Sequence, residues 1–284
     1  MTPSDNKAAG RFMNRELAVR IAAALVLIPI ALLDVWAGSV WFELGIAMIA
    51  AIMAAEWCRM VHRGSQFQFA LHALAAIGAV LVASRSGAVI ALQVIAVCWA
   101  MSLIGEVSRK KSGSRWAWWG IPYIALPGLA LILIRQSPEY GLFAVLWLLA
   151  VVWSADTLAY VFGRLIGGPK LAPSISPNNT WAGLAGAVTG GIVASAAMGG
   201  YAAFPTVWPL LVAGGVLAVL EQVGEMFESA AKRRFGFKDS GRIIPGHGGV
   251  LDRVDGLMFA AVAAAAFGYA RGGHEAVASG LVVW

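Results

Sequence analysis

The most regular feature of the chain is a series of apolar runs of about 18–22 residues, separated by short polar and charged stretches. An α-helix needs about 20 apolar residues to cross the hydrocarbon core of a bilayer. Because backbone polar groups must be paired within lipid, runs of this length are expected to be helical. The pattern predicts nine spans, with eight or ten left open because the third is short: about 18–37, 40–60, 68–84, 87–106, 116–134, 141–162, 180–200, 207–228 and 255–271.

The composition agrees with a membrane protein. Sixty per cent of the 284 residues are apolar and 13% are charged, whereas soluble domains carry about 25% charged residues. The longest polar stretch, about 229–255, is too short to form a core of its own. We therefore predict an all-α polytopic membrane protein without a soluble domain. It would be a single domain over 1–284, with N-terminal helices to about 135 and the polar motifs within about 141–271.

The distribution of charge predicts a topology. A net charge of +6 would by itself be compatible with nucleic-acid binding. However, 18 of the 21 Lys and Arg residues fall in the N-terminal segment and in alternate loops, and the others are Arg85, Arg135 and Arg271. Since cytoplasmic loops are enriched in Lys and Arg, we expect a cytoplasmic N-terminus, an external C-terminus and no nucleic-acid partner. The first apolar run exceeds a signal-peptide core, so we expect it to be retained.

The two cysteines, Cys58 and Cys98, both lie inside apolar runs and have no CxxC spacing. Neither a disulfide nor a thiolate metal site is expected from this pattern. We interpret both as small core residues.

A first polar stretch, from Trp153 to Trp181, interrupts the apolar pattern. Asp156 lies inside an apolar run, where a charge is costly unless it is paired or faces water. It is either a structural ion pair, for instance with Arg164, or part of a site wall, and the second reading is favoured. The two G-x-x-x-G spacings, Gly163/Gly167 and Gly186/Gly190, indicate close helix packing. The stretch before Lys170 is not a Walker A loop, because no Ser or Thr follows the lysine.

A second polar stretch, from Glu221 to Asp255, carries more chemistry. Four of its charged residues recur on one helix face: Glu221, Glu225, Glu228 and Lys232. Asp252 and Asp255 have i, i+3 spacing, so both carboxylates can point the same way. Carboxylates beside cations suit Mg²⁺ and phosphates.

The turn after Pro245 and the loop around it admit other roles. The glycine-rich turn can present backbone N–H groups to an anion. His247 alone does not define a zinc site, and we expect it to contact phosphate or to stabilise the turn. The alternative is a basic loop beside anionic lipid headgroups, in which the carboxylates only balance charge.

At these residues the sequence resembles the phosphatidate cytidylyltransferase (CDP-diacylglycerol synthase) family. The family pattern is Ser-x-x-Lys-Arg, four residues, Lys-Asp, and later Pro-Gly-His-Gly-Gly, two residues, Asp-Arg-x-Asp. It is present here with every anchor from Ser229 to Asp255. The upstream pattern is also present, at Asp156, Ala159, Tyr160, Gly163, Arg164, Ser176, Pro177, Thr180 and Trp181. The specific motifs occupy about the C-terminal half of the chain.

Three positions depart from the family pattern. Glu225 stands where the family usually has Asp, so its carboxylate reaches one methylene further. Asn178 and Asn179 replace two lysines, which removes positive charge from that segment. Ala182 replaces a common glutamate. The departures bear on efficiency, on metal position or preference and on substrate detail, not on the class of reaction.

The resemblance implies CTP-dependent cytidylyl transfer to phosphatidate, giving CDP-diacylglycerol and pyrophosphate. It implies Mg²⁺, with three carboxylates able to hold a second cation, and a homodimer in a bacterial-type inner membrane whose active site faces the cytoplasm. The metal ligands would be Glu225, Asp252 and Asp255, and the catalytic residues Lys232, Asp239, Asp252 and Asp255. The substrate-binding residues would be Asp156, Arg164, Ser176, Thr180, Ser229, Arg233, Lys238, His247, Gly248, Gly249 and Arg253.

Two other functions are left open by the residues. A CTP-dependent lipid kinase of the polyprenol type would release CDP instead of pyrophosphate. An ion-coupled transporter would use Asp156, Glu56 and Glu221 as carriers within the membrane, but it leaves the glycine-rich turn unexplained. Glu56 has no role in the motif pattern, and we expect it to pair with Arg59 or to lie near the site.

Overall fold

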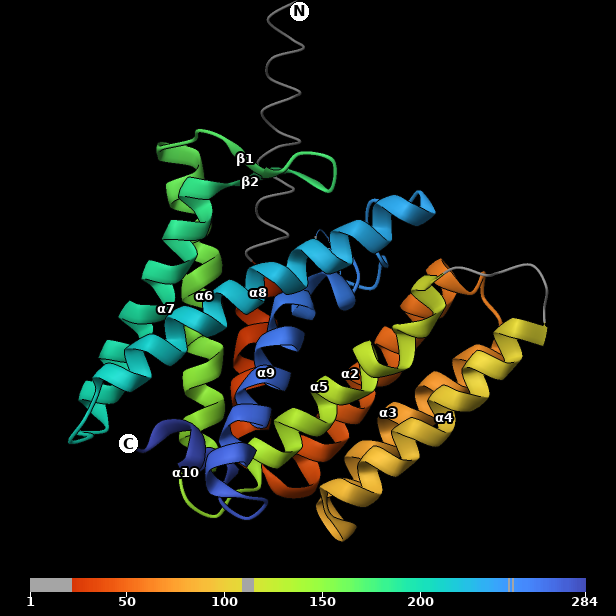
Figure 1. Ribbon diagram of the computed structural model, residues 1–284, viewed down its shortest axis with the longest axis horizontal. Helices are drawn as coiled ribbons and strands as arrows, with labels where there is room; N and C mark the ends of the chain where they lie inside the picture. Colours follow the sequence, from red (N-terminus) through yellow and green to blue (C-terminus); the bar gives the residue numbers. More distant parts are fainter. Residues whose placement is uncertain (1–21, 109–114, 245, 247) are drawn as a thin grey trace, which may run out of the picture.

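The computed structural model describes residues 22–108, 115–244, 246 and 248–284, and these form a bundle of helices with one small hairpin (Figure 1). A helix over Ala22–Ala37 comes first. The other elements are α2 (Ser39–Val61), α3 (Gln66–Ser86), α4 (Ala88–Ser108), the 3₁₀ helix η1 (Arg115–Trp118), α5 (Gly120–Arg135), α6 (Gly141–Leu165), β1 (Lys170–Ala172), β2 (Ser176–Thr180), α7 (Trp181–Tyr201), α8 (Trp208–Phe235), α9 (Leu251–Gly272) and α10 (Val277–Val282).

Eight spans are long and apolar enough to cross a membrane within the described part of the chain, and seven of them are α2 to α4 and α6 to α9. The eighth, Arg115–Arg135, joins η1 to α5. The predicted all-α membrane fold without a soluble domain is thus confirmed. The described helix at Ala22–Ala37 is shorter, and part of the predicted first span lies outside the described residues. The count of nine therefore stays a prediction.

The connections of the bundle gather at two opposite ends (Figure 1). The α2–α3, α6–α7 and α8–α9 connections lie at the upper end of the view, and the α3–α4, α5–α6 and α7–α8 connections lie at the lower end. The basic residues of the lower end are held by the chain itself. Arg85 pairs with Glu43 at 3.1 Å, and Arg135 donates to the carbonyl of Val35 at 2.7 Å.

Two helices extend beyond the predicted spans. The apolar run predicted an end near residue 228, but α8 continues for two more turns to Phe235. Its last turn carries Lys232, Arg233 and Arg234, and positive charge at a helix C-terminus is favourable. Gly236 ends the helix with a left-handed conformation. Similarly, α9 begins at Leu251, ahead of the predicted 255. The functional carboxylates of both segments therefore lie on helices.

The segment between α6 and α7 folds into a hairpin that hydropathy alone does not predict. Lys170 pairs with Thr180 and Ala172 with Ser176 in antiparallel register. Thr180 then starts α7 as its N-cap, because its hydroxyl accepts a hydrogen bond from the backbone N–H of Gly183 at 3.0 Å. The hairpin is thereby fixed over the upper end of α6 and α7.

Candidate active site

A pocket of about 440 Å³ opens between α6, α7, α8 and the β2 strand. Its lining residues are mostly small or polar and come from both polar stretches of the sequence. They are Asp156, Ala159, Tyr160, Gly163, Arg164, Asn178, Asn179, Thr180, Gly183, Gln222 and Glu225. The structure therefore brings the upstream motif and α8 together around one cavity.

Three carboxylates meet at this pocket. Oxygens of Asp156, Glu221 and Glu225 all lie within 4.8 Å of one another. Asp156 is exposed, Glu225 is half-buried, and Glu221 is 1% exposed. The Oε1 atom of Glu221 is buried and accepts no hydrogen bond from the described residues. A hard, oxygen-rich donor set with an oxygen left unsatisfied fits a divalent cation such as Mg²⁺.

This grouping differs from the metal ligands that the resemblance implied. Of the implied set, only Glu225 belongs to the cluster, and Asp156 and Glu221 join it from α6 and α8. Asp255 lies on α9 near enough to Glu225 for their charges to interact. The sequence spacing places Glu221 on the same helix face as Glu225, but the contribution of Asp156 depends on the contact between α6 and α8.

Two side-chain amides hold Glu225 in the pocket. Gln222 and Asn179 each donate to its Oε2 atom at 3.3 Å. Gln222 also donates to Glu221 Oε2 at 3.0 Å. Asn179 thus places a neutral donor in the pocket wall beside Glu225.

Small residues allow the helices that carry the site to approach closely. A Cβ on Gly224 would come within 2.5 Å of the Asp255 carbonyl oxygen, and one on Gly256 within 2.6 Å of Glu221 Oε1. A Cβ on Gly190 would lie within 2.6 Å of the Ser154 carbonyl carbon on α6. Helix packing through Gly186 and Gly190 is therefore confirmed, and both face α6 of the same chain.

The other predicted glycine pair behaves differently. Gly163 faces Thr180, whereas Gly167 has nothing within 4 Å of its Cβ position. Gly167 instead has φ of 66°, which a glycine adopts without strain. The prediction of close helix packing is wrong for Gly167, because this residue forms part of the turn before the hairpin.

Beside the pocket, Lys232 joins α8 to α9. Its ammonium forms ion pairs with Glu228, one turn earlier on α8, and with Asp252 Oδ1 at 2.7 Å. Glu228 is fully buried and the Lys232 side chain is 12% exposed. Removing one member of such a buried pair leaves an uncompensated charge. The alternative that these charges are a solvated loop beside headgroups does not fit this burial.

Asp252 organises the loop between the two helices. Its Oδ2 atom accepts hydrogen bonds from the backbone N–H of Ser240 and Gly249, both at 2.8 Å, and from the Ser240 hydroxyl at 2.9 Å. The Gly249 amide, expected to face a ligand anion, thus already donates to a carboxylate of the chain. Both oxygens of Asp252 are occupied, which makes it an anchor of the loop.

Glu56, on α2, is a second anchor that the motifs did not identify. It accepts hydrogen bonds from the backbone N–H of Val250 at 3.0 Å and of Leu251 at 2.8 Å. The residue is buried, with 4% of its surface exposed. Arg59, one turn along, donates to the carbonyl of Ser240. The sequence shows a glutamate within an apolar run, which indicates a special role for Glu56. It does not identify the hydrogen-bond partners, because they lie about 190 positions away. A carboxylate bound in this way is unsuited to carrying ions.

The remaining predicted residues divide by position. Arg164 lines the pocket and donates to the Tyr160 hydroxyl at 2.7 Å, not to Asp156. Ser176 is on β2, and Ser229 is half-buried on α8. Four others are exposed around the loop: Arg233, Lys238, Asp239 and Arg253. Gly248 adopts φ of 84° and its carbonyl accepts from Ile244 at 3.0 Å. His247 and Pro245 lie outside the described residues.

Taken together, the fold and the site define an integral membrane protein with a carboxylate-lined pocket set beside a buried ion-pair network. The chain belongs to the cytidylyltransferase family, which matches residues 18–270. It is therefore a nucleotidyltransferase, and the resemblance seen in the motifs is confirmed.

Relatives agree with this assignment. The chain is 40% identical over 259 residues to the phosphatidate cytidylyltransferase of Brucella melitensis biotype 1, covering 89% of this chain and 93% of that protein. It is 43% identical over 137 residues to the phosphatidate cytidylyltransferase of Staphylococcus saprophyticus, covering 48% of this chain and 53% of that protein.

Proposed function

We propose that the protein transfers the cytidylyl group of CTP to phosphatidate, producing CDP-diacylglycerol and pyrophosphate. An oxygen of the phosphatidate phosphate attacks the α-phosphorus of CTP. The bond from that phosphorus to the bridging α–β oxygen breaks, and pyrophosphate leaves. The observation that carries the proposal is the carboxylate pocket at the end of the bundle, in a chain whose relatives bear this activity by name.

The reaction sets a charge problem that the site residues address. Nucleophile and leaving group are both anionic, so positioning and charge neutralisation supply most of the catalysis. A lipid phosphate is already ionised near neutral pH and needs no general base. Arg164 at the pocket wall supplies a fixed positive charge for phosphate oxygens. The amides of Asn178 and Asn179 supply neutral donors beside it.

Mg²⁺ fits the cluster of Asp156, Glu221 and Glu225, and when bound it would neutralise charge on the CTP phosphates. Asp255 is close enough to Glu225 to contribute to the same charge environment or to a second cation. Lys232 and Asp252 keep α8 and α9 in register, and the exposed Arg233, Lys238 and Arg253 suit the headgroup of the lipid substrate.

We further infer that the pocket faces the cytoplasm of a bacterial inner membrane. The pocket is lined by the later part of α6, by β2 and by Gly183 of α7. The α6–α7 connection lies at the same end of the bundle as the α2–α3 and α8–α9 connections, and these connections are rich in Lys and Arg. This supports the cytoplasmic side, where CTP is available. A homodimer also remains a prediction. The glycines of α7 do not require one, since Gly186, Gly190 and Gly191 pack against α6 and α8 of the same chain. Light scattering of the detergent-solubilised protein measures the assembly directly.

The test is an assay with CTP labelled in the cytosine, phosphatidate and Mg²⁺ on the purified protein. We expect Mg²⁺-dependent formation of labelled CDP-lipid and of pyrophosphate in equal amounts. Glu225→Gln should abolish both products, whereas Glu225→Asp, which restores the family residue, should keep them. Glu275→Gln is the matched control, because the Glu275 side chain is 84% exposed on the loop between α9 and α10. Release of CDP in place of pyrophosphate would contradict the proposal.

A further inference from the structure

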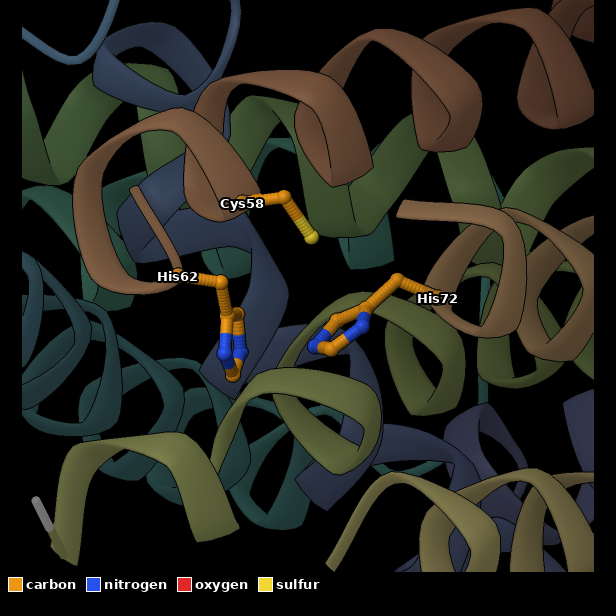
Figure 2. Close-up of side chains that lie close together, drawn as sticks. All are labelled: Cys58, His62 and His72. Atoms are coloured by element: carbon orange, nitrogen blue, oxygen red, sulfur yellow. The ribbon is translucent and has the colours of Figure 1, made fainter. Parts of the chain in front are cut away.

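A second cluster of ligand-type side chains lies outside the carboxylate pocket, between α2 and α3. Cys58 is in the last turn of α2, His62 is the residue that caps the C-terminus of this helix, and His72 is on α3. A ligand atom from each of the three lies within 4.8 Å of the other two. All three residues are buried. Figure 2 shows the edge of the His72 ring directed toward the His62 ring, with the Cys58 sulfur beside them, and the two ring centroids are 5.0 Å apart.

Both imidazole rings are oriented by hydrogen bonds from their Nδ1 atoms. His62 Nδ1 lies 2.7 Å from Glu106 Oε1, and His72 Nδ1 lies 2.7 Å from the backbone carbonyl of Gln68. The Gln68 side chain in turn donates to Glu106 Oε1 at 3.0 Å. Metal-bound histidines are characteristically held in this way by a carboxylate or a carbonyl, which fixes the tautomer and directs the other nitrogen at the metal.

The other ring nitrogen of His72 gives an independent indication of a ligand. His72 is fully buried, and its Nε2 atom has no hydrogen-bond partner among the described residues. In Figure 2 this side of the ring faces His62. A buried polar atom without a partner is energetically unfavourable. The ring can occupy this position because residue 120 is glycine, whose Cβ would otherwise collide with Nε2.

We propose that Cys58, His62 and His72 form a buried binding site for a zinc ion that holds α2 against α3. One sulfur and two imidazole nitrogens are a donor set typical of zinc. In a tetrahedral zinc site such donors are about 3.3–3.8 Å apart, given bond lengths of about 2.0–2.3 Å. The three ligand atoms lie within 4.8 Å of one another, so binding would draw them closer together by at most about 1–1.5 Å. Glu106, hydrogen-bonded to His62 Nδ1, is an outer partner that orients this ring.

The burial of the cluster makes its role structural. Catalytic zinc sites keep a position open to water or substrate, whereas all three donors here are enclosed. Binding converts the Cys58 thiol to a thiolate and releases one proton, so affinity falls as the pH is lowered. The site is close in sequence to Glu56 and Arg59, which hold the loop after α8. Zinc would therefore stiffen the end of α2 that supports the active site.

The experiment measures metal on the full-length, detergent-purified protein. After chelation and addition of zinc, followed by removal of the excess, we expect one zinc per chain that Cys58→Ser does not retain. Cys98→Ser is the matched control, since Cys98 is equally buried but lies on α4 away from the cluster. Glu106→Gln should weaken zinc binding by about 10- to 100-fold, the usual effect of losing an outer partner. Each variant is first checked for a monodisperse elution profile.

A spectroscopic measurement on the wild type keeps the test independent of variant folding. Co²⁺ in place of zinc should give a sulfur-to-cobalt charge-transfer band, which binding at the carboxylate pocket cannot produce because that pocket has no sulfur donor. X-ray absorption of the zinc form should show one sulfur at about 2.3 Å and nitrogen donors at about 2.0 Å. Absence of the cobalt band, zinc with only oxygen neighbours, or equal zinc content in Cys58→Ser and Cys98→Ser would overturn the proposal.

Discussion

Replacing Glu56 with glutamine tests whether a residue of α2 positions the active-site loop. The Glu56 carboxylate accepts hydrogen bonds from the backbone N–H of Val250 and of Leu251, at 3.0 Å and 2.8 Å. Each of these is a hydrogen bond to a charged group, worth about 1.5–3 kcal/mol. In Glu56→Gln, one acceptor oxygen becomes an NH₂ group that faces a backbone N–H, so at least one of these bonds is lost.

The expected magnitude follows from the loss of one such bond. A change of about 1.5–3 kcal/mol raises the equilibrium constant for local opening of the loop by roughly 10- to 150-fold. Amide hydrogen exchange reports this opening directly. The N–H groups of Ser240, Gly249, Val250 and Leu251 should exchange faster by about that factor, while α5 stays protected. The rate of CDP-lipid formation should fall because Asp252, in the first turn of α9, binds the same loop.

The matched control is Glu43→Gln on the same helix. Glu43 is also buried, but it lies at the opposite end of α2, where it pairs with Arg85. This variant should leave exchange in the 240–251 loop and turnover unchanged. If Glu56→Gln shows wild-type exchange of the loop amides in folded protein, the anchoring role derived from the hydrogen bonds is wrong.

Three further changes test the site. Gly224→Ala should lower the thermal midpoint and the activity together, because the added Cβ meets the Asp255 carbonyl at 2.5 Å and overpacking costs about 1–3 kcal/mol; an unaltered melting curve would contradict this close approach. Lys232→Met should lower the midpoint more, since breaking a buried pair costs about 3–5 kcal/mol, and a stability equal to wild type would show the ion pairs with Glu228 and Asp252 to be dispensable. Asn179→Lys adds the positive charge of the family pattern to the pocket wall and should lower the KM for CTP by about tenfold; a KM that stays the same or rises would show that this wall does not meet the phosphates.

The membrane fold could be predicted because its signal is local. An apolar run of the right length defines a span regardless of its neighbours, and α2 to α9 lie where the runs predict them. The predicted helix ends are wrong for α8 and α9, where charged residues continue the helix beyond the apolar run. Lys232 and Asp252 satisfy each other across α8 and α9, so both helices continue through residues that hydropathy alone assigns to a loop.

The site was predictable only in part, for a related reason. Motif spacing identified Glu225 and Arg164, and both line the pocket. It could not identify the partners of Glu56, because those hydrogen bonds join residues on separate helices. The same holds for Cys58, which was interpreted as a core residue. It is indeed buried, but His72 reaches it only through the packing of α2 and α3.

The hydrogen bonds from α2 to the loop after α8 have a consequence for how the chain can be divided. By motif content the protein falls into an N-terminal part without signature residues and a C-terminal part that holds them all. By folding it is indivisible, because the backbone at Val250 and Leu251 has its acceptor in the first part. A fragment containing every family motif would thus be expected to be inactive alone, and to regain activity when the N-terminal helices are supplied as a separate polypeptide.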